Sequence, residues 1–370
     1  MSNMTTTVDI GNMSNEELLH LYKKIKKNIV KYNNLQFTRK IMLNSLYGAL
    51  SNQYFRWYDF DLAEAITTSG QLTIKWAEKT FNEYLNNLLK TKNVDYVIAM
   101  DTDSCYVCMN ELVKRLGIED RHKIVKALSE FCDKKIQQVL NESFIKLANK
   151  MHAYAQKMHM KREAIAINAL WRAKKMYVLN VLDLEGVTYD SPILKIQGIE
   201  AVRSSTPKFC REGIKQALKI MLNENEEALI KFIDDFKNNF MNKSYQDISY
   251  PRSVNDLEKY QCNSNIYKKG TPIHVRGSLL YNYYISKIKT KNYPQITNGD
   301  KIRFIYLREP NTINENVIAY IESIPEELKL EKYIDKQKMY EKLFLEPVKE
   351  FSNIMKFNIE KQDTLESFFF

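Results

Sequence analysis

The chain has 370 residues, of which 44% are hydrophobic and 12% aromatic, so it can bury two or three globular cores and is not a disordered chain. Its 55 Lys and Arg residues exceed its 45 Asp and Glu residues by a net charge of +10, which favours a polyanionic partner such as nucleic acid, although an evenly spread basic surface would have the same composition. It contains no run of about 18 apolar residues and no apolar signal-peptide core, so we expect no membrane partner and an intracellular protein.

The first predicted element is a helix that begins near Ser14. Ser14 and Glu17 have the spacing of a capping box, and apolar residues then recur at helical intervals. The lysine-rich face at residues 23–27 is most simply a solvated charged surface.

Three polar residues lie on one face of the following helical stretch. Lys40, Asn44 and Tyr47 are at positions i, i+4 and i+7. A cation, a carboxamide and a phenol aligned in this way could hold a triphosphate, bind a sugar and pack against a base pair, and Gly48 would let a base approach the backbone. Taken alone, the pattern equally favours an amphipathic helix with incidental polar side chains.

A long helix is expected from Asp59 to Lys90, followed by two strands that flank a short acidic turn. The turn, residues 101–104, reads Asp-Thr-Asp-Ser. Carboxylate oxygens suit Mg²⁺, which keeps its other positions for water and substrate phosphates. An isolated pair of aspartates is more often an ordinary turn, so the metal-site hypothesis depends on neighbouring motifs. Cys105 and Cys108, inside a predicted strand, favour buried reduced thiols over a zinc or redox site.

The remaining chain alternates helical and extended patterns. Helical periodicity covers residues 111–159, and short strands are expected at 163–167 and 171–181, with Lys174 and Lys175 on opposite faces of the second strand. A turn at 183–186 and a partner strand follow. Thr206 and Pro207 are typical of an N-cap and a first helical residue, which predicts one amphipathic helix over 208–239.

Three of these segments together resemble the motifs of family B DNA polymerases. Residues 40–48 are similar to the fingers helix, residues 101–104 to the palm metal motif, and residues 173–177 to the K-K-R-Y segment, with Met176 in place of its usual arginine. The motifs have the family's order and spacing. Further similarity at residues 50–76, 161–165, 198–200, 204–207 and 274–277 covers nearly the whole chain and is greatest to the replicative polymerases of T-even-like bacteriophages.

The resemblance implies an α+β fold: a palm with an antiparallel sheet and packed helices, fingers helices and a mostly helical thumb. The implied domains are fingers at 1–50, palm at 51–207, thumb at 208–355 and a clamp-binding tail at 356–370.

The resemblance also implies a reaction, in which a primer 3′-hydroxyl attacks the α-phosphate of a deoxynucleoside triphosphate with the help of two Mg²⁺ ions. Asp101 and Asp103 would be the catalytic metal ligands, and Thr102, Ser104 and Glu163 would lie near the active site. Nucleotide contacts are implied for Lys40, Asn44, Tyr47 and Gly48, and contacts with the primer-template DNA for Lys174, Lys175, Tyr177, Ser204, Ser205, His274 and Arg276.

The last residues resemble the peptide by which polymerases dock on sliding clamps. Gln362, Leu365, Phe368 and Phe369 fit the pattern Q-x-x-L-x-x-F-F. Such an apolar terminus is hard to explain as core, although a folded-back tail is the alternative.

Two parts of the resembled family are not found in the sequence. These are the earlier palm motif D-x-x-S-L-Y-P-S, which carries another metal-binding aspartate, and the exonuclease domain. We therefore expect a carboxyl-terminal subunit of a split polymerase, acting in the cytoplasm of an infected bacterial host, whose amino-terminal partner chain completes one of the two Mg²⁺ sites. Alternatives are a fragment that binds DNA and clamp without polymerising and, more remotely, an RNA polymerase or reverse transcriptase.

Overall fold

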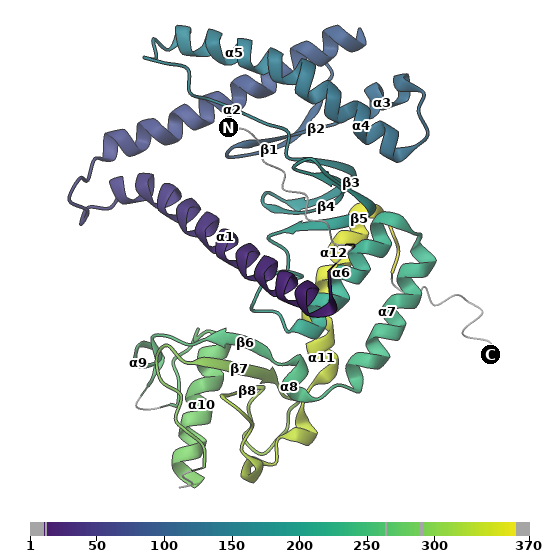
Figure 1. Ribbon diagram of the computed structural model, residues 1–370. Helices are drawn as coiled ribbons and strands as arrows, with labels where there is room; N and C mark the ends of the chain where they lie inside the picture. The colour runs from purple at the N-terminus through teal and green to yellow at the C-terminus, as the bar shows by residue number, and fades with distance from the viewer. Residues whose placement is uncertain (1–10, 12, 263–264, 289–291, 360–370) are drawn as a thin grey trace. The chain divides into compact units, whose positions relative to one another are not determined.

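The computed structural model describes residues 11, 13–262, 265–288 and 292–359 (Figure 1). The fold combines long helices with small antiparallel sheets, which confirms the α+β class. The chain forms two compact units: unit 1 contains residues 1–116 and 135–160, and unit 2 contains residues 117–134 and 161–370. None of the described helices is long and apolar enough to cross a bilayer.

Two long helices dominate unit 1, and both begin where the sequence predicts. Helix α1 (Asn15–Leu50) has the complete capping box, in which the Ser14 hydroxyl accepts from the Glu17 N–H and the Glu17 carboxylate accepts from the Ser14 N–H. Helix α2 (Phe60–Leu89) is capped by the Asp59 side chain and ends at Lys90, whose φ is 50°. The side chains of Ser14 and Asp59 thus accept hydrogen bonds from backbone N–H groups that have no partner within the first helical turn.

The acidic hairpin of unit 1 packs on α2. Strands β1 (Val97–Asp101) and β2 (Ser104–Val107) are antiparallel, and Leu85, Leu89 and Tyr96 form the small core beneath them. Helix α5 (Gln137–Lys150) runs beside α2 (Figure 1). There the indole N–H of Trp76 donates to Ser143 Oγ at 2.8 Å. Helix α3 (Asn110–Leu116) completes the unit.

Unit 2 contains two three-stranded antiparallel sheets. The first has the order β3 (Ala164–Ala173), β4 (Met176–Leu184), β5 (Val187–Gln197), and the second has the order β6 (Tyr250–Ser253), β7 (Lys301–Tyr306), β8 (Val317–Tyr320). Helix α10 (Ile273–Ile288) lies directly on the second sheet. The contact is so close that a Cβ built on Gly277 would lie 2.9 Å from the Ala319 backbone nitrogen.

The predicted helix over 208–239 is wrong, because the structure has two helices there. Helix α6 (Lys208–Asn223) ends at Glu224, which is extended, and Asn225 caps α7 (Glu226–Met241) by accepting from the Ala228 N–H at 3.0 Å. The predicted N-cap is also one residue off, since Pro207 occupies that position. Neither Gly nor Pro stands between α6 and α7, and the apolar periodicity continues through the break. The sequence therefore does not mark it.

Helix α12 (Glu346–Met355) and the helices near it close the core of unit 2. Phe236 and Phe344 stack in this core with ring centroids 4.0 Å apart, and Tyr281 is buried in the same core. The remaining elements of the chain are α4 (Arg121–Phe131), the π-helical turns η1 (Cys132–Ile136) and η4 (Glu341–Leu345), α8 (Tyr245–Ile248), α9 (Leu257–Tyr260), the 3₁₀ turns η2 (Glu326–Leu328) and η3 (Glu331–Tyr333), α11 (Lys336–Tyr340) and α12 (Glu346–Met355).

Candidate active site and nucleic-acid interface

The acidic turn is a two-residue connection between β1 and β2. Asp101 and Ser104 pair across the hairpin, and Thr102 and Asp103 form the exposed tip. Thr102 has a φ of 51°, and its hydroxyl donates to Asp101 Oδ1 at 3.1 Å. The Ser104 hydroxyl donates to the Asp101 carbonyl at 3.1 Å. The hairpin predicted from the sequence is therefore confirmed, and both neighbouring hydroxyls are used to shape it.

The donor set of this turn suits a hard divalent cation. Asp101 and Asp103 offer carboxylate oxygens, which Mg²⁺ prefers, and Asp103 is exposed at the tip, where a metal and its water ligands have room. Within the described part of the chain, no three His, Cys, Asp or Glu side chains gather as a metal site. The two carboxylates therefore fit part of a metal site.

The neighbouring thiol is a poor metal ligand by comparison. Burial, with a smaller contribution from Glu78, raises the pKa of Cys105 to about 11, so its thiolate is scarce at neutral pH. All five cysteines lie among the described residues, and none of them forms a disulfide. Cys105 and Cys108 are partly and not fully buried, and their reduced state stays a prediction.

The polar face predicted at residues 40–48 lies on α1. Lys40, Asn44, Tyr47 and Gly48 are all helical and exposed, and the Tyr47 side chain is 49% exposed. Nothing lies within 4 Å of a Cβ built on Gly48. The helix therefore presents all four residues to solvent, as a nucleotide-binding face requires.

Lys174 and Lys175 lie in the turn between β3 and β4, not inside a strand as predicted. Ala173 pairs with Met176, and Lys175 adopts a φ of 63°. A left-handed lysine is uncommon, and nothing in the sequence marks it. The hairpin places both lysines together at one end of the sheet, which corrects the expectation that they project from opposite faces.

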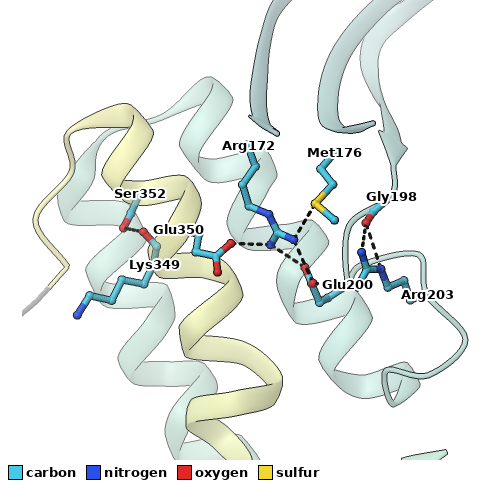
Figure 2. Close-up of polar contacts among 8 residues, drawn as sticks. All are labelled: Arg172, Met176, Gly198, Glu200, Arg203, Lys349, Glu350 and Ser352. Carbon is cyan, nitrogen blue, oxygen red and sulfur yellow. Dashed lines mark hydrogen bonds and ion pairs between the residues drawn. The ribbon is translucent and has the colours of Figure 1, made fainter. Parts of the chain in front are cut away.

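Gly198 fixes this lysine turn from the adjacent strand. Its φ is 66°, and a Cβ at this position would lie 2.1 Å from the Lys175 carbonyl oxygen. Arg203 holds Gly198 by donating from Nη2 to its carbonyl oxygen at 2.7 Å (Figure 2). Only glycine allows β5 to end against the lysine turn.

Arg172 joins the same end of the sheet to the segment after β5 and to α12. Its guanidinium binds both carboxylate oxygens of Glu200, at 2.9 and 3.2 Å, and Glu350 at 2.9 Å (Figure 2). Its Nη2 also contacts Met176 Sδ at 3.2 Å. An arginine at position 176, as in the resembled motif, would bring a second cation to Arg172. This network was not predicted, because its members are far apart in the sequence.

Tyr177, which the resemblance implies as a DNA contact, is only 7% exposed, and its ring centroid lies 6.0 Å from that of Trp171. It packs into unit 2 beside the lysine turn.

Glu163 immediately precedes β3 and forms an ion pair with Lys195 of β5. Nearby, Asp183 is almost completely buried, and it accepts hydrogen bonds from Arg162, from the Thr188 hydroxyl at 2.9 Å and from the Gly186 N–H at 3.1 Å. Burial alone raises the pKa of Asp183, but these hydrogen bonds outweigh burial and lower it.

The remaining predicted DNA contacts differ in their surroundings. Ser204 is exposed and Ser205 partly exposed in the segment before α6. Burial and the nearby Arg252 lower the pKa of His274 on α10, which favours its neutral form and weakens any phosphate contact. Arg276 donates to Asn316 and lies over the Tyr267 ring, with 5.5 Å from guanidinium carbon to centroid. The clamp motif, Gln362, Leu365, Phe368 and Phe369, lies outside the described residues.

Comparison with known proteins identifies the class. The family model described as DNA polymerase family B matches residues 16–354, so the chain belongs to this family.

The most informative relatives come from two bacteriophages. The chain is 32% identical over 355 residues to the DNA-directed DNA polymerase of Enterobacteria phage T4, covering 92% of this chain and 39% of the relative. It is 34% identical over 345 residues to that of Escherichia phage RB69, covering 89% of this chain and 38% of the relative. DNA polymerase 1 of Aeropyrum pernix is 22% identical over 290 residues, covering 74% of this chain and 25% of the relative. The chain thus spans about two fifths of the length of the phage relatives.

Proposed function

We propose that this chain supplies the carboxyl-terminal part of a template-directed DNA polymerase that adds deoxynucleotides to a primer 3′ end. The observation that carries the proposal is the two-residue hairpin turn with Asp101 and Asp103, in a chain of the DNA polymerase B family. The exposed face of α1 with Lys40 and the lysine turn beside Gly198 support it.

In this proposal each set of residues has one task. Asp101 and Asp103 hold Mg²⁺, which when bound stabilises negative charge on the reacting phosphate. Lys40 neutralises the outer phosphates of the nucleotide and Asn44 assists it, while Tyr47 contacts the nascent base pair. Lys174 and Lys175 hold the primer backbone, a positioning contact without sequence information.

The proposal includes an amino-terminal partner chain. In unit 1 we assign only the carboxylates of Asp101 and Asp103 to the metals. Two-metal nucleotidyl transfer needs further oxygen ligands around the reacting atoms, so another chain must supply them. The partner contributes the metal-binding aspartate of the earlier palm motif and the exonuclease domain, and the complex acts in the infected bacterial host.

The test is primer extension by this chain together with a partner that ends before α1. Mixed with that partner, the chain should extend a primed template in the presence of Mg²⁺. Asp103→Asn should reduce extension by at least 100-fold, because charge stabilisation at the reacting phosphate is usually the largest catalytic effect. Asp235→Asn removes the same charge from an exposed position on α7 and serves as the control. Equal activity of the Asp103 and Asp235 variants would contradict the assignment.

The second candidate function is a binding module without chemistry. The turn between β3 and β4 favours it, because its Lys174 and Lys175 suit a phosphate backbone. This module would bind DNA in a salt-sensitive manner but would extend no primer with any partner.

The tail at 356–370 is part of the proposal as a docking peptide for a sliding clamp. Replacing Phe368 and Phe369 by alanine should abolish binding to the clamp and leave extension without the clamp unchanged. Unchanged clamp binding would point instead to a folded-back tail.

A further inference from the structure

The guanidinium of Arg172, near the end of β3, is held by side chains from several other elements of unit 2. It binds both carboxylate oxygens of Glu200 and one oxygen of Glu350 (Figure 2). Its central carbon lies 5.6 Å from the centroid of the buried Phe351 ring, and its Nη2 lies 3.2 Å from Met176 Sδ. The Arg172 side chain is 14% exposed, so these contacts fix it in one place.

One of these contacts leads directly to the turn between β3 and β4. The turn consists of Lys174 and Lys175, both exposed, and Ala173 pairs with Met176 across its base. Met176, whose sulfur contacts the Arg172 guanidinium, is the first residue of β4. Arg172 therefore packs against the base of the turn.

A second path reaches the same turn through Glu200. This carboxylate also pairs with Arg203 at 3.4 Å, and Arg203 donates from Nε and Nη2 to the Gly198 carbonyl at 3.1 and 2.7 Å (Figure 2). Gly198 lies so close to the turn that a Cβ there would be 2.1 Å from the Lys175 carbonyl oxygen. Arg172 thus supports the turn from β3 and, through Glu200, from the segment after β5.

The tip of the Met176 side chain shows where an arginine at that position would reach. A methionine sulfur occupies the place of an arginine Cδ, and the guanidinium extends beyond it. Because Met176 Sδ already contacts Arg172 Nη2, an arginine at position 176 would bring its guanidinium to the place that Arg172 now occupies. The space beside Glu200 and Glu350 therefore suits one guanidinium and not two.

We propose that Arg172 supplies from β3 the guanidinium that the resembled motif carries at position 176, and that it holds the Lys174–Lys175 turn in place for the primer backbone. Arg172 is a positioning residue, because it contacts protein side chains while the turn contacts the DNA. The assignment of the primer to the turn rests on the proposed function.

The charges of the network support this exchange of positions. Arg172 and Arg203 face the carboxylates of Glu200 and Glu350, so the network carries two positive and two negative charges. Moving one guanidinium from β3 to β4 leaves that balance unchanged. Adding a second guanidinium beside Arg172, or removing the first, leaves one charge without its counterpart in a partly buried place.

The test compares three variants of the full chain. Arg172→Met removes the guanidinium, Met176→Arg adds a second one, and the exchanged variant carries both substitutions. Amide hydrogen exchange of residues 173–177 reports on the turn without DNA. Fluorescence anisotropy over a series of salt concentrations reports on binding of a short primer-template duplex, with no nucleotide, Mg²⁺ or partner chain added.

Asp183→Asn is the matched control for a loss of stability alone. It breaks the buried ion pair with Arg162 near the opposite end of β4 from the turn. Arg172→Lys keeps the charge but not the fork that binds two carboxylate oxygens, so it should show the effects of Arg172→Met at smaller size. It keeps the test valid if Arg172→Met unfolds.

Each single variant should exchange its turn amides about 10-fold faster and bind the duplex about 10-fold more weakly than the unmodified chain. The exchanged variant should recover both properties to within about 3-fold, because residues in contact are coupled and the guanidinium is restored. Asp183→Asn should change neither the turn amides nor duplex binding, since it lies outside the network.

An exchanged variant whose turn is no more protected than that of Arg172→Met would overturn the proposal, because the guanidinium would then act only from its own position. So would equal effects of Arg172→Met and Asp183→Asn on the turn. Unchanged duplex binding despite a loosened turn would overturn the role of Arg172 toward DNA. An unmodified chain that binds no duplex would refute the proposed function of the turn instead, and the exchange measurements, which need no DNA, would still decide whether Arg172 positions it.

Discussion

Gly198 and Gly270 have the same left-handed backbone conformation in different surroundings. Their φ angles are 66° and 85°, but a Cβ at Gly198 would lie 2.1 Å from the Lys175 carbonyl oxygen, whereas nothing lies within 4 Å at Gly270. Gly270→Ala should cost about 1–2 kcal/mol of unfolding free energy from backbone strain alone. Gly198→Ala should cost clearly more and also weaken DNA binding, because the Lys174–Lys175 turn must move. Urea unfolding measures the cost of each substitution, and fluorescence anisotropy measures DNA binding. Equal unfolding costs for the two variants would contradict the close packing at Gly198.

Asp183 should make the stability of unit 2 depend on pH in the acid range. Because its folded pKa is lowered, its ion pair with Arg162 stabilises the fold above the unfolded pKa of about 3.9 and is lost as pH falls through the folded pKa. Asp183→Asn leaves Arg162 buried without its carboxylate, so it should cost about 3 kcal/mol at pH 7. The difference from the unmodified chain should shrink below pH 4.

Unfolding curves at pH 7 and at pH 3 measure this effect. Asp190→Asn, at an exposed position on β5, is the control and should change stability by less than about 0.5 kcal/mol at both pH values. A cost for Asp183→Asn that is equal at the two pH values would show that the buried ion pair does not titrate as argued.

At the scale of elements, Arg172 is the link that holds β3 against α12 and the segment after β5. Its side chain is 14% exposed and that of Glu200 is 23% exposed, while that of Glu350 is 56% exposed. Arg172→Gln should therefore cost about 2–3 kcal/mol, because it strands partly buried carboxylates. Glu350→Gln should cost less than about 1 kcal/mol, since an exposed ion pair contributes little. Chemical denaturation of both variants compares them, and the opposite ranking would contradict this assignment.

The elements that the sequence predicts correctly are those with local signals. The capping box at Ser14 and Glu17, the start of α2 next to Asp59 and the acidic hairpin each depend on residues within a few positions of one another. The Lys174–Lys175 turn was missed because its left-handed residue is a lysine and no glycine marks it. The break before α7 was missed because the apolar periodicity continues through it.

The parts of the site that depend on distant residues could not be predicted in the same way. Arg172 and Glu350 are separated by most of unit 2 in the sequence. Family resemblance supplied Asp101, Asp103 and the lysine pair because motifs are contiguous. The resemblance did not predict the side chains that hold those motifs in place, because each of these side chains lies on a different, distant element.

At the scale of the whole molecule, α1 carries apolar side chains that nothing in the described part of unit 1 buries. None of its described residues is buried, and many of its large apolar side chains are exposed, including Phe37 at 65%, Met42 at 68%, Leu43 at 72% and Leu46 at 60%. A surface of this kind is characteristic of a helix that packs on another chain or segment. The proposed amino-terminal partner, which carries the remaining fingers, is therefore expected to cover α1.

Hydrogen–deuterium exchange tests this expectation. In the isolated chain the amides of α1 should exchange quickly, because few tertiary contacts protect them, while those of α10, most of whose first half is buried, should exchange slowly. Adding the partner should slow exchange in α1 and leave α10 unchanged.

Leu43→Ser and Leu46→Ser together should weaken the complex at least 10-fold, since each removes an apolar anchor, whereas Val187→Ser, 58% exposed on β5, should not. An α1 that exchanges equally fast with and without the partner would place the partner's contact elsewhere on this chain.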